Sequence, residues 1–142
     1  MMDARSEQLL VGVHPDLVKV MRSALQSPQP FRIVYGLRTP EAEAQALASG
    51  HSETLHSRHL PNHAGVACAV DVAHVLGGKI DFAPGHEAYV FGAIAVQVLA
   101  AAHQLQIPLQ WGGADVGAWI PGVISHFHDW GHFQLPWAQY PA

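Results

Sequence analysis

Two short stretches of the sequence contain the residue types that bind metal ions and move protons. The first holds His59 and His63 and is followed by Asp71, and the second is the string Asp-Trp-Gly-His from Asp129 to His132. A hydrolytic zinc site takes three His or carboxylate ligands and keeps one coordination position open for water. A further carboxylate takes the proton of that water. The two stretches therefore contain the parts of a metal-dependent hydrolase.

Asp71 is a polar residue within the apolar run VACAVDVA, residues 66–73, which we predict to be a buried strand. An unpaired carboxylate is costly to bury, so Asp71 needs a positively charged partner. An ion pair with Arg38 and a metal ion shared with His59 are the two candidates. The presence of His59 shortly before the strand favours the metal ion.

The side-chain directions of the His residues near the C-terminus depend on the local backbone. On an extended chain, residues of like parity share a face, so His126, His128 and His132 could align while Asp129 points away. A bend at Gly131 would instead bring Asp129 and His132 together, with His132 as a ligand and Asp129 as the base. We interpret His126 and His128 as ordinary surface residues.

The hydrophobic pattern around these residues predicts both helices and strands. Helices are expected at 15–26, 40–49 and about 86–104. Strands are expected at 31–36, 66–73 and 108–111. Thr39 is the expected N-cap of the second helix and Gly50 its stop, and residues 51–65 read as a long functional loop. We therefore expect an α+β fold in which a small, mostly antiparallel sheet carries the candidate ligands and helices pack on it.

The composition indicates a single domain over residues 1–142. Of these residues 49% are hydrophobic and 13% charged, which is enough apolar content for one core. Seven Lys and Arg against 11 Asp and Glu give a net charge of −4, which argues against a nucleic acid or an acidic membrane as partner. The 11 His equal the carboxylates in number, and imidazole is the commonest metal ligand, so metal chemistry is the first hypothesis.

The chain has one cysteine, Cys68, which excludes an intramolecular disulfide and a Cys-rich metal cluster. We interpret Cys68 as a small buried apolar residue. The first residues contain no visible export signal, and the most apolar stretch, 88–102, is too short to span a bilayer. We therefore expect a cytoplasmic protein without a signal peptide, and a monomer.

These motifs, in this order, resemble the zinc peptidases of bacterial cell-wall peptides. The family includes the phage endolysins that are L-alanyl-D-glutamate endopeptidases and the VanY-type D-alanyl-D-alanine carboxypeptidases. The blocks that carry the resemblance extend from about residue 10 to residue 136. In chain order they are VGVHPDLVKVM, FRIVYGLRTPEAEAQALASG, HSRHL, AVDVA, WGG and DWGHFQLP. The resemblance implies a fold of the hedgehog and DD-peptidase type.

The resemblance also implies the roles of individual residues. The Ser-Arg-His, Ala-Val-Asp and Asp-x-x-His elements of the family fall on His59, Asp71 and His132, which would be the zinc ligands. In the last of these elements, Asp129 would be the catalytic general base. Arg38, in the string GLRT, matches the family's arginine that holds the substrate carbonyl or carboxylate.

The resemblance also concerns the expected loop at 51–65, which precedes the expected strand at 66–73. Ser57 would orient the substrate-binding site. His59 and Asp71 are 12 positions apart, more than is usual in the family, whereas His63 is eight positions before Asp71. His63 therefore stays open as an alternative metal ligand.

The resemblance implies hydrolysis of the peptidoglycan stem peptide at the bond between L-alanine and D-glutamate. The protein would be a phage or prophage endolysin that reaches the cell wall after holin-type release through the membrane. A D-alanyl-D-alanine carboxypeptidase is the alternative enzyme, and a non-catalytic zinc-stabilised wall-binding module is the alternative from another class. Asp129 argues against the binding module, because a structural zinc ion needs no base and is usually closed by four ligands.

Overall fold

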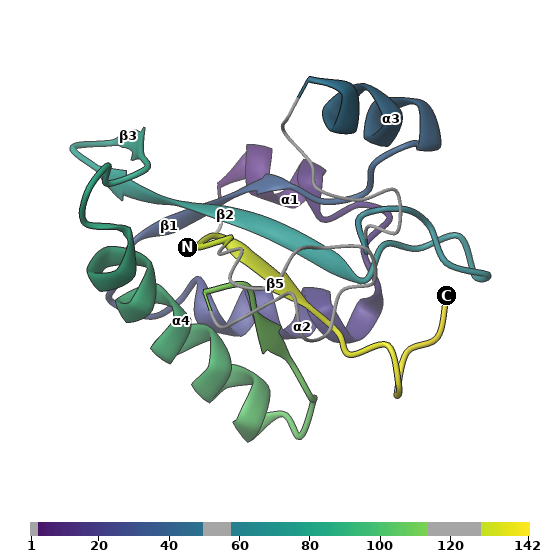
Figure 1. Cartoon of the computed structure of the whole chain (residues 1–142). Helices are drawn as coiled ribbons and strands as arrows, with labels where there is room; N and C mark the ends of the chain where they lie inside the picture. The colour runs from purple at the N-terminus through teal and green to yellow at the C-terminus, as the bar shows by residue number, and fades with distance from the viewer. Residues whose placement is uncertain (1–2, 50–57, 114–128) are drawn as a thin grey trace.

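The computed structural model describes residues 3–49, 58–113 and 129–142. The described residues form one sheet and the helices that surround it (Figure 1). In chain order the elements are α1 (Ala4–Leu9), α2 (Pro15–Ala24), β1 (Phe31–Tyr35), α3 (Pro40–Ala48), β2 (Ala69–Leu76), β3 (Lys79–Asp81), α4 (Glu87–Gln104), β4 (Gln110–Trp111) and β5 (His132–Gln134). This is the α+β architecture that the sequence predicts.

The sheet has the strand order β1-β2-β5-β4, and β3 forms a hairpin with β2. Every pairing among these strands is antiparallel. In the register of the central strand, Asp71 lies opposite Tyr35 on one side and opposite His132 on the other. The sheet therefore joins residues that are about sixty positions apart in the sequence.

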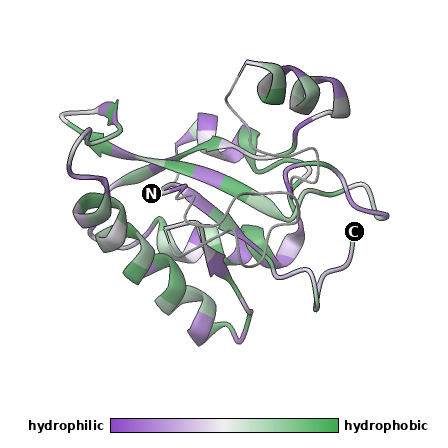
Figure 2. Ribbon diagram, in the orientation of Figure 1, coloured by the Kyte–Doolittle hydropathy of each residue, from purple (hydrophilic) through white to green (hydrophobic). Residues whose placement is uncertain are grey.

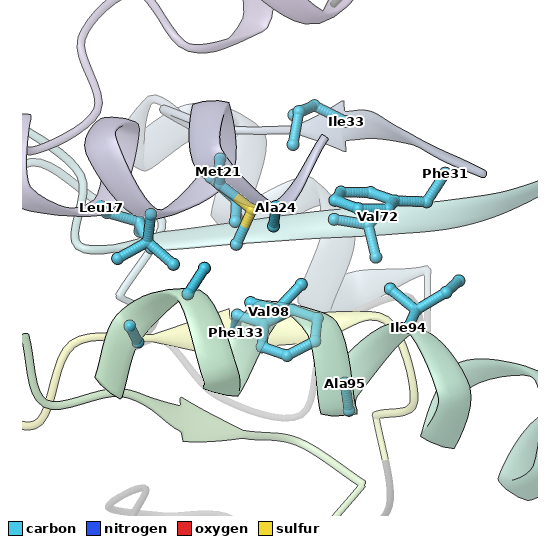
Figure 3. Packing of buried hydrophobic residues seen from close by; sticks show 14 of the residues in the cluster. Leu17, Met21, Ala24, Phe31, Ile33, Val72, Ile94, Ala95, Val98 and Phe133 are labelled. Carbon is cyan, nitrogen blue, oxygen red and sulfur yellow. The ribbon is translucent and has the colours of Figure 1, made fainter. Parts of the chain in front are cut away.

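Helices α2 and α4 pack against each other and cover one face of the sheet (Figure 1). Val70, Val72 and Phe133 belong to the apolar cluster that these helices close. Figure 3 shows Phe133 beside Val98 of α4 and Val72 beside Phe31 of β1. Because side chains alternate along a strand, Asp71 and His132 lie on the opposite face. Figure 2 shows the resulting hydrophilic bands along the otherwise apolar β2.

Most of the predicted elements are present at nearly the predicted positions. The apolar stripe of α2 is buried, as its periodicity requires, and α4 begins within a residue of the expected start. Thr39 caps α3 as predicted, because its side chain accepts a hydrogen bond from the amide of Ala42. β4 is shorter than predicted and contains only Gln110 and Trp111. The expected helix stop at Gly50 lies outside the described residues.

The predicted position of the central strand is wrong by three residues at each end. The sequence pattern places it at 66–73, whereas β2 spans Ala69–Leu76. Ala67 forms isolated bridges with Val13 and Pro61 instead of joining β2. At the other end, β2 continues because its last residues pair with β3 across a turn at Gly77 and Gly78. Both glycines have positive φ, 60° and 78°, as a tight hairpin turn requires.

Three elements, α1, β3 and β5, are absent from the sequence-based expectation. With six, three and three residues, they are too short for a hydrophobic period to show. α1 is nevertheless firmly attached, because Ser6 is fully buried and its hydroxyl accepts a hydrogen bond from the amide of Ile33 in β1 at 3.1 Å. Among the described helices, none has the length and apolar character needed to cross a membrane.

Candidate metal centre and active site

The carboxylate of Asp71 lies between two imidazoles on the face of the sheet opposite α2 and α4. Its Oδ1 atom is 3.2 Å from Nε2 of His59 and 3.0 Å from Nδ1 of His132. Both His side chains are buried, and the two rings meet edge to face with centroids 5.1 Å apart. One donor atom from each of the three residues lies within 4.8 Å of the others. The arrangement can hold a metal ion.

His59 is oriented by a backbone carbonyl behind it. Its Nδ1 atom lies 2.9 Å from the carbonyl oxygen of Gly36, which can only accept, so Nδ1 carries the proton. In the neutral imidazole, Nε2 then presents a lone pair toward Asp71. Gly36 itself allows the end of α1 to approach, since a Cβ there would lie 2.1 Å from the carbonyl oxygen of Leu9.

His132 is oriented in the same way by a side chain. Its Nε2 atom lies 2.8 Å from Oε1 of Gln134, and the amide nitrogen of Gln134 donates to Gln110 at 3.4 Å. With Nε2 as the donor, Nδ1 of His132 presents its lone pair toward Asp71. Gln134 is fully buried, and the sequence analysis missed it. The available signal was its position two residues after His132, which places both side chains on the same face of a strand.

Three lone-pair atoms therefore converge on one point, and only a cation can satisfy them together. Without a metal ion, that cation is a proton. Burial lowers the pKa of His132, but the hydrogen bond and the charge of Asp71 outweigh this and raise the pKa to about 9. Burial likewise opposes ionisation of Asp71, yet His59 and His132 hold its pKa well below the usual range. Two imidazoles and a carboxylate are a donor set that suits a transition-metal ion.

Asp129 lies beside this group without joining it. Its Oδ2 atom is 4.0 Å from Nδ1 of His132, and its side chain is 43% exposed. Loss of solvent, followed by the negative charge of Asp71, raises the pKa of Asp129 to about 6, although the charges of His132, His59 and Arg38 act in the opposite direction. A carboxylate with such a pKa can take up and release a proton near neutral pH.

A hydrogen-bonded turn brings Asp129 and His132 together. The amide of His132 donates to the carbonyl of Asp129 at 3.1 Å, and the amide of Asp129 donates to the carbonyl of Gly112 at 2.9 Å. The indole of Trp111 donates to the carbonyl of Trp130 at 2.8 Å. The WGG segment thus supports the Asp-x-x-His turn from the neighbouring strand.

Gly131 permits the turn for a reason different from the expected one. The sequence predicts a bend at Gly131, and Asp129 and His132 do converge across it. Its backbone is not in the left-handed region, however. The requirement is space, because a Cβ on Gly131 would lie 2.3 Å from the carbonyl oxygen of Val72.

Comparison with known proteins shows the family to which the chain belongs. The family model described as phage L-alanyl-D-glutamate peptidase matches residues 1–135. The chain belongs to the phage L-alanyl-D-glutamate peptidase family. It is 34% identical over 137 residues to the L-alanyl-D-glutamate peptidase of Escherichia phage T5, which covers 92% of this chain and 93% of the relative.

Solved structures agree with membership of the phage L-alanyl-D-glutamate peptidase family. The crystal structure of the Serratia marcescens L-Ala D-Glu endopeptidase ChiX superposes with a TM-score of 0.78 and 37% identity, covering 98% of this chain and 92% of that one. The vancomycin resistance D,D-dipeptidase VanXYg matches with a TM-score of 0.51 and 16% identity, over 91% of this chain and 51% of that one. The likeness to VanXYg concerns the fold alone.

Arg38 lies at the edge of the site in this member of the phage L-alanyl-D-glutamate peptidase family. Its guanidinium stacks over the ring of Tyr35, 4.8 Å from the centroid, and its charge lowers the pKa of Asp129. The backbone amide of Arg38 donates to the carbonyl of His59 at 2.8 Å. Arg38 is thus close to Asp129 and linked to the loop that carries His59.

Two other sequence candidates, His63 and Cys68, do not join the group around Asp71. His63 is exposed, and its Nδ1 atom lies 3.1 Å from the carbonyl oxygen of Ala142. Cys68 is buried, with its sulfur 3.7 Å from the amide of Asn62. Ser57 lies outside the described residues, as do His126 and His128.

Arg58, which precedes His59 in the family's Ser-Arg-His element, has a structural role. It is buried and donates hydrogen bonds to the carbonyls of Leu135 and Tyr140. Its guanidinium lies over the ring of Trp137, 4.0 Å from the centroid. Arg58 therefore attaches the segment that carries His59 to the C-terminal end of the chain.

Proposed function

We propose that this protein is a zinc-dependent endopeptidase that hydrolyses the peptidoglycan stem peptide between L-alanine and D-glutamate. The observation that carries the proposal is the convergence of His59, Asp71 and His132 on one point, with Asp129 beside it. Membership of the phage L-alanyl-D-glutamate peptidase family supports the substrate class and the bond. In this proposal residues 1–142 act as a single zinc peptidase domain.

His59, Asp71 and His132 would hold the zinc ion, and His63, which lies apart from them, would not. When bound, zinc lowers the pKa of a coordinated water and polarises a substrate carbonyl. The exposed side chain of Asp129 is open to both water and substrate. The buried His side chains present one nitrogen each to the centre, and Gly36 and Gln134 hold the other nitrogen.

Asp129 is the proposed general base and then the general acid. It takes a proton from the water whose oxygen attacks the carbonyl carbon of L-alanine. When the carbon–nitrogen bond breaks, Asp129 gives that proton to the departing amine of D-glutamate. Arg38 would stabilise the negative charge that develops on the carbonyl oxygen. Ser57 would help to orient the substrate.

The proposed biological role is that of a phage or prophage lysin acting on the cell wall as a monomer. It would wait in the cytoplasm until a holin-type membrane hole releases it. A D-alanyl-D-alanine carboxypeptidase would use the same residues, so the product decides between the two activities.

Mass spectrometry of purified peptidoglycan digested with the zinc-loaded protein tests this proposal, with Asp129→Ala as the control. We expect new N-terminal D-glutamate, or D-isoglutamine, and L-alanine left on the glycan. The control should give no product while its zinc content stays near one equivalent. Release of free D-alanine alone would establish the carboxypeptidase instead. Zinc binding with no product from the unaltered protein would indicate a non-catalytic wall-binding module.

A further inference from the structure

A cleft of about 700 Å³ opens beside the carboxylates of Asp71 and Asp129. β1, β2, the turn at 129–131, α1, β3 and the start of α4 all contribute residues to its lining. Its wall includes three large apolar side chains that remain exposed, Tyr35 at 54%, Ile80 at 46% and Phe82 at 59%. Exposed apolar surface that adjoins a reactive centre is typical of a ligand-binding site.

Arg5 is the only cationic residue among the described residues that line this cleft. Its backbone position is determined by its neighbour Ser6, which is fully buried and bonded to the amide of Ile33. The hydroxyl of Ser6 in turn donates to the carboxylate of Asp3 at 2.8 Å. α1 therefore presents Arg5 to the cleft from a fixed position on the sheet.

The guanidinium of Arg5 is available for a ligand. Within the described part of the chain, it makes no hydrogen bond or ion pair. The nearest acidic residues in the sequence have other partners, since Asp3 accepts from Ser6 and Glu7 pairs with Arg22 at 3.0 Å. A cation in the lining of a cleft that also contains the carboxylates of Asp71 and Asp129 is suited to an anionic group on the substrate.

The charges of the stem peptide lie on one side of the scissile bond. On the L-alanine side, the peptide is joined through an uncharged amide to the lactyl group of the sugar. On the D-glutamate side, the first carboxylate is attached next to the scissile nitrogen, within reach of Arg38 beside Asp129. Further along, the terminal D-alanine has a carboxylate in every stem peptide, and the third residue has one on its side chain only in some of them. Diaminopimelate has such a carboxylate, whereas lysine in the same place has only the ammonium group.

We propose that Arg5 forms a subsite for the free carboxylate of diaminopimelate in the third position of the stem peptide. This inference rests on the proposed function, because it takes the scissile bond to lie at the metal centre. The apolar wall of Tyr35, Ile80 and Phe82 packs against the methylene groups of D-glutamate and diaminopimelate. Glu87, which also lines the cleft, supplies a negative charge for the ammonium group that diaminopimelate and lysine share.

Two synthetic tetrapeptides test the subsite because they differ in one carboxyl group. Both have the form L-Ala-γ-D-Glu-X-D-Ala, with meso-diaminopimelate or L-lysine as X. We expect the zinc-loaded protein to cleave the diaminopimelate peptide with a kcat/KM at least about tenfold higher, as one charge-assisted contact provides. Arg5→Gln should remove this preference by raising KM for the diaminopimelate peptide, and Arg5→Lys should restore part of it.

The matched control is Lys19→Gln, which removes an exposed cation of α2 that does not line the cleft. It should leave kcat/KM for both peptides within about twofold of the unaltered protein. Two results would overturn the subsite and leave the proposed function intact. One is an equal kcat/KM of the unaltered protein for the two peptides. The other is an equal fall in kcat/KM for both peptides in Arg5→Gln. Failure to cleave either peptide at the L-Ala–D-Glu bond would overturn the proposed function, and calorimetric binding of the same peptides would then test the subsite. Equal affinities would overturn it.

Discussion

One carboxylate oxygen of Asp71 lies at nearly the same distance from the two imidazoles, 3.2 Å from His59 and 3.0 Å from His132. A carboxylate on an otherwise apolar strand would be costly to bury alone. Here its Oδ1 atom faces a nitrogen of His59 and a nitrogen of His132, each turned by a hydrogen bond from behind. The carboxylate and the lone pairs around it are therefore arranged for a cation before any cation binds.

At the scale of single residues, the two candidate histidines of the loop should differ sharply. His59→Ala removes a buried group of the centre and should reduce bound zinc to well below one equivalent per chain. His63→Ala removes an exposed side chain whose Nδ1 atom lies beside the carbonyl oxygen of Ala142 and not beside Asp71, so zinc content should stay near one. Elemental analysis after dialysis measures both. Loss of zinc in His63→Ala, with zinc retained in His59→Ala, would reverse the assignment.

Gln134 should tune zinc affinity without touching the metal ion. Gln134→Leu removes the acceptor that keeps the proton on Nε2 of His132, so we expect zinc affinity to fall by about 10- to 100-fold. Gln134→Glu keeps an acceptor oxygen and should bind zinc more tightly than the Leu variant. Competition with a chromophoric chelator gives the affinities.

A matched control for this change is Gln97→Leu in α4. Gln97 also makes two hydrogen bonds, to the backbone of Gln29, but these lie outside the metal centre. This variant can lose stability, yet its zinc affinity should equal that of the unaltered protein. If both Leu variants bind zinc normally, Gln134 has no positioning role.

At the scale of elements, the metal centre depends on how closely β4 and the 129–132 turn approach. Gly112 lies where a Cβ would be 2.3 Å from the carbonyl oxygen of Asp129 and 2.9 Å from Cβ of His132. The strand end and the turn are also joined by hydrogen bonds in both directions. A base and a ligand carried by this turn are therefore positioned by a glycine in the turn that follows β4.

Gly112→Ala should push the turn outward and displace Asp129 and His132 together. We expect a loss of about 1–3 kcal/mol in the free energy of unfolding, as for other overpacked sites, and a fall in kcat/KM of at least about tenfold. Urea unfolding and peptide hydrolysis measure the two effects.

Gly92→Ala is the control, because a Cβ there meets no atom within 4 Å. In this variant the stability of helix α4 should increase by up to about 1 kcal/mol. Equal unfolding free energies and equal kcat/KM values for the two variants would show that Gly112 does not position the turn.

At the scale of the whole molecule, the apolar core and the metal centre lie on opposite faces of the same sheet. The core joins α2, α4 and the strands through side chains such as Val72 and Phe133. The centre uses the alternate residues of those strands. The fold therefore does not need the metal ion to bury its apolar surface.

Removal of the metal ion should consequently lower stability without unfolding the chain. After chelation we expect the far-UV circular dichroism spectrum to persist and the Tm to fall. Zinc at about a thousandfold excess over its Kd should restore about 4 kcal/mol of unfolding free energy. Loss of the spectrum on chelation would show that the core depends on the metal ion.

The zinc-free protein should also have a characteristic dependence of stability on pH. The folded pKa of His132, about 9, is above the ordinary value of 6.5, so its pairing with Asp71 stabilises the fold fully below pH 6.5. That contribution should be lost as the pH rises through 9. Urea midpoints between pH 6 and 10 measure it, and His132→Ala should flatten the profile. A zinc-free protein that becomes more stable over this range would contradict the assigned pairing.

The sequence by itself determined the elements whose signals are local. The period of apolar residues predicted α2 and α4, and the capping side chain of Thr39 predicted the start of α3. The motif strings identified the residue types at the centre and the turn that brings Asp129 toward His132. These features depend on neighbours within a few positions, so a single chain read in order contains the necessary information.

Only the tertiary structure decided which of these side chains meet. It shifted the central strand to Ala69–Leu76, placed His59 and not His63 beside Asp71, and brought Gln134 behind His132. Strand register and hairpin length depend on partners far along the chain, and a shift of one residue turns every side chain to the other face. For this reason the sequence determined the components of the centre, and the antiparallel pairing of β2 with β5 determined its geometry.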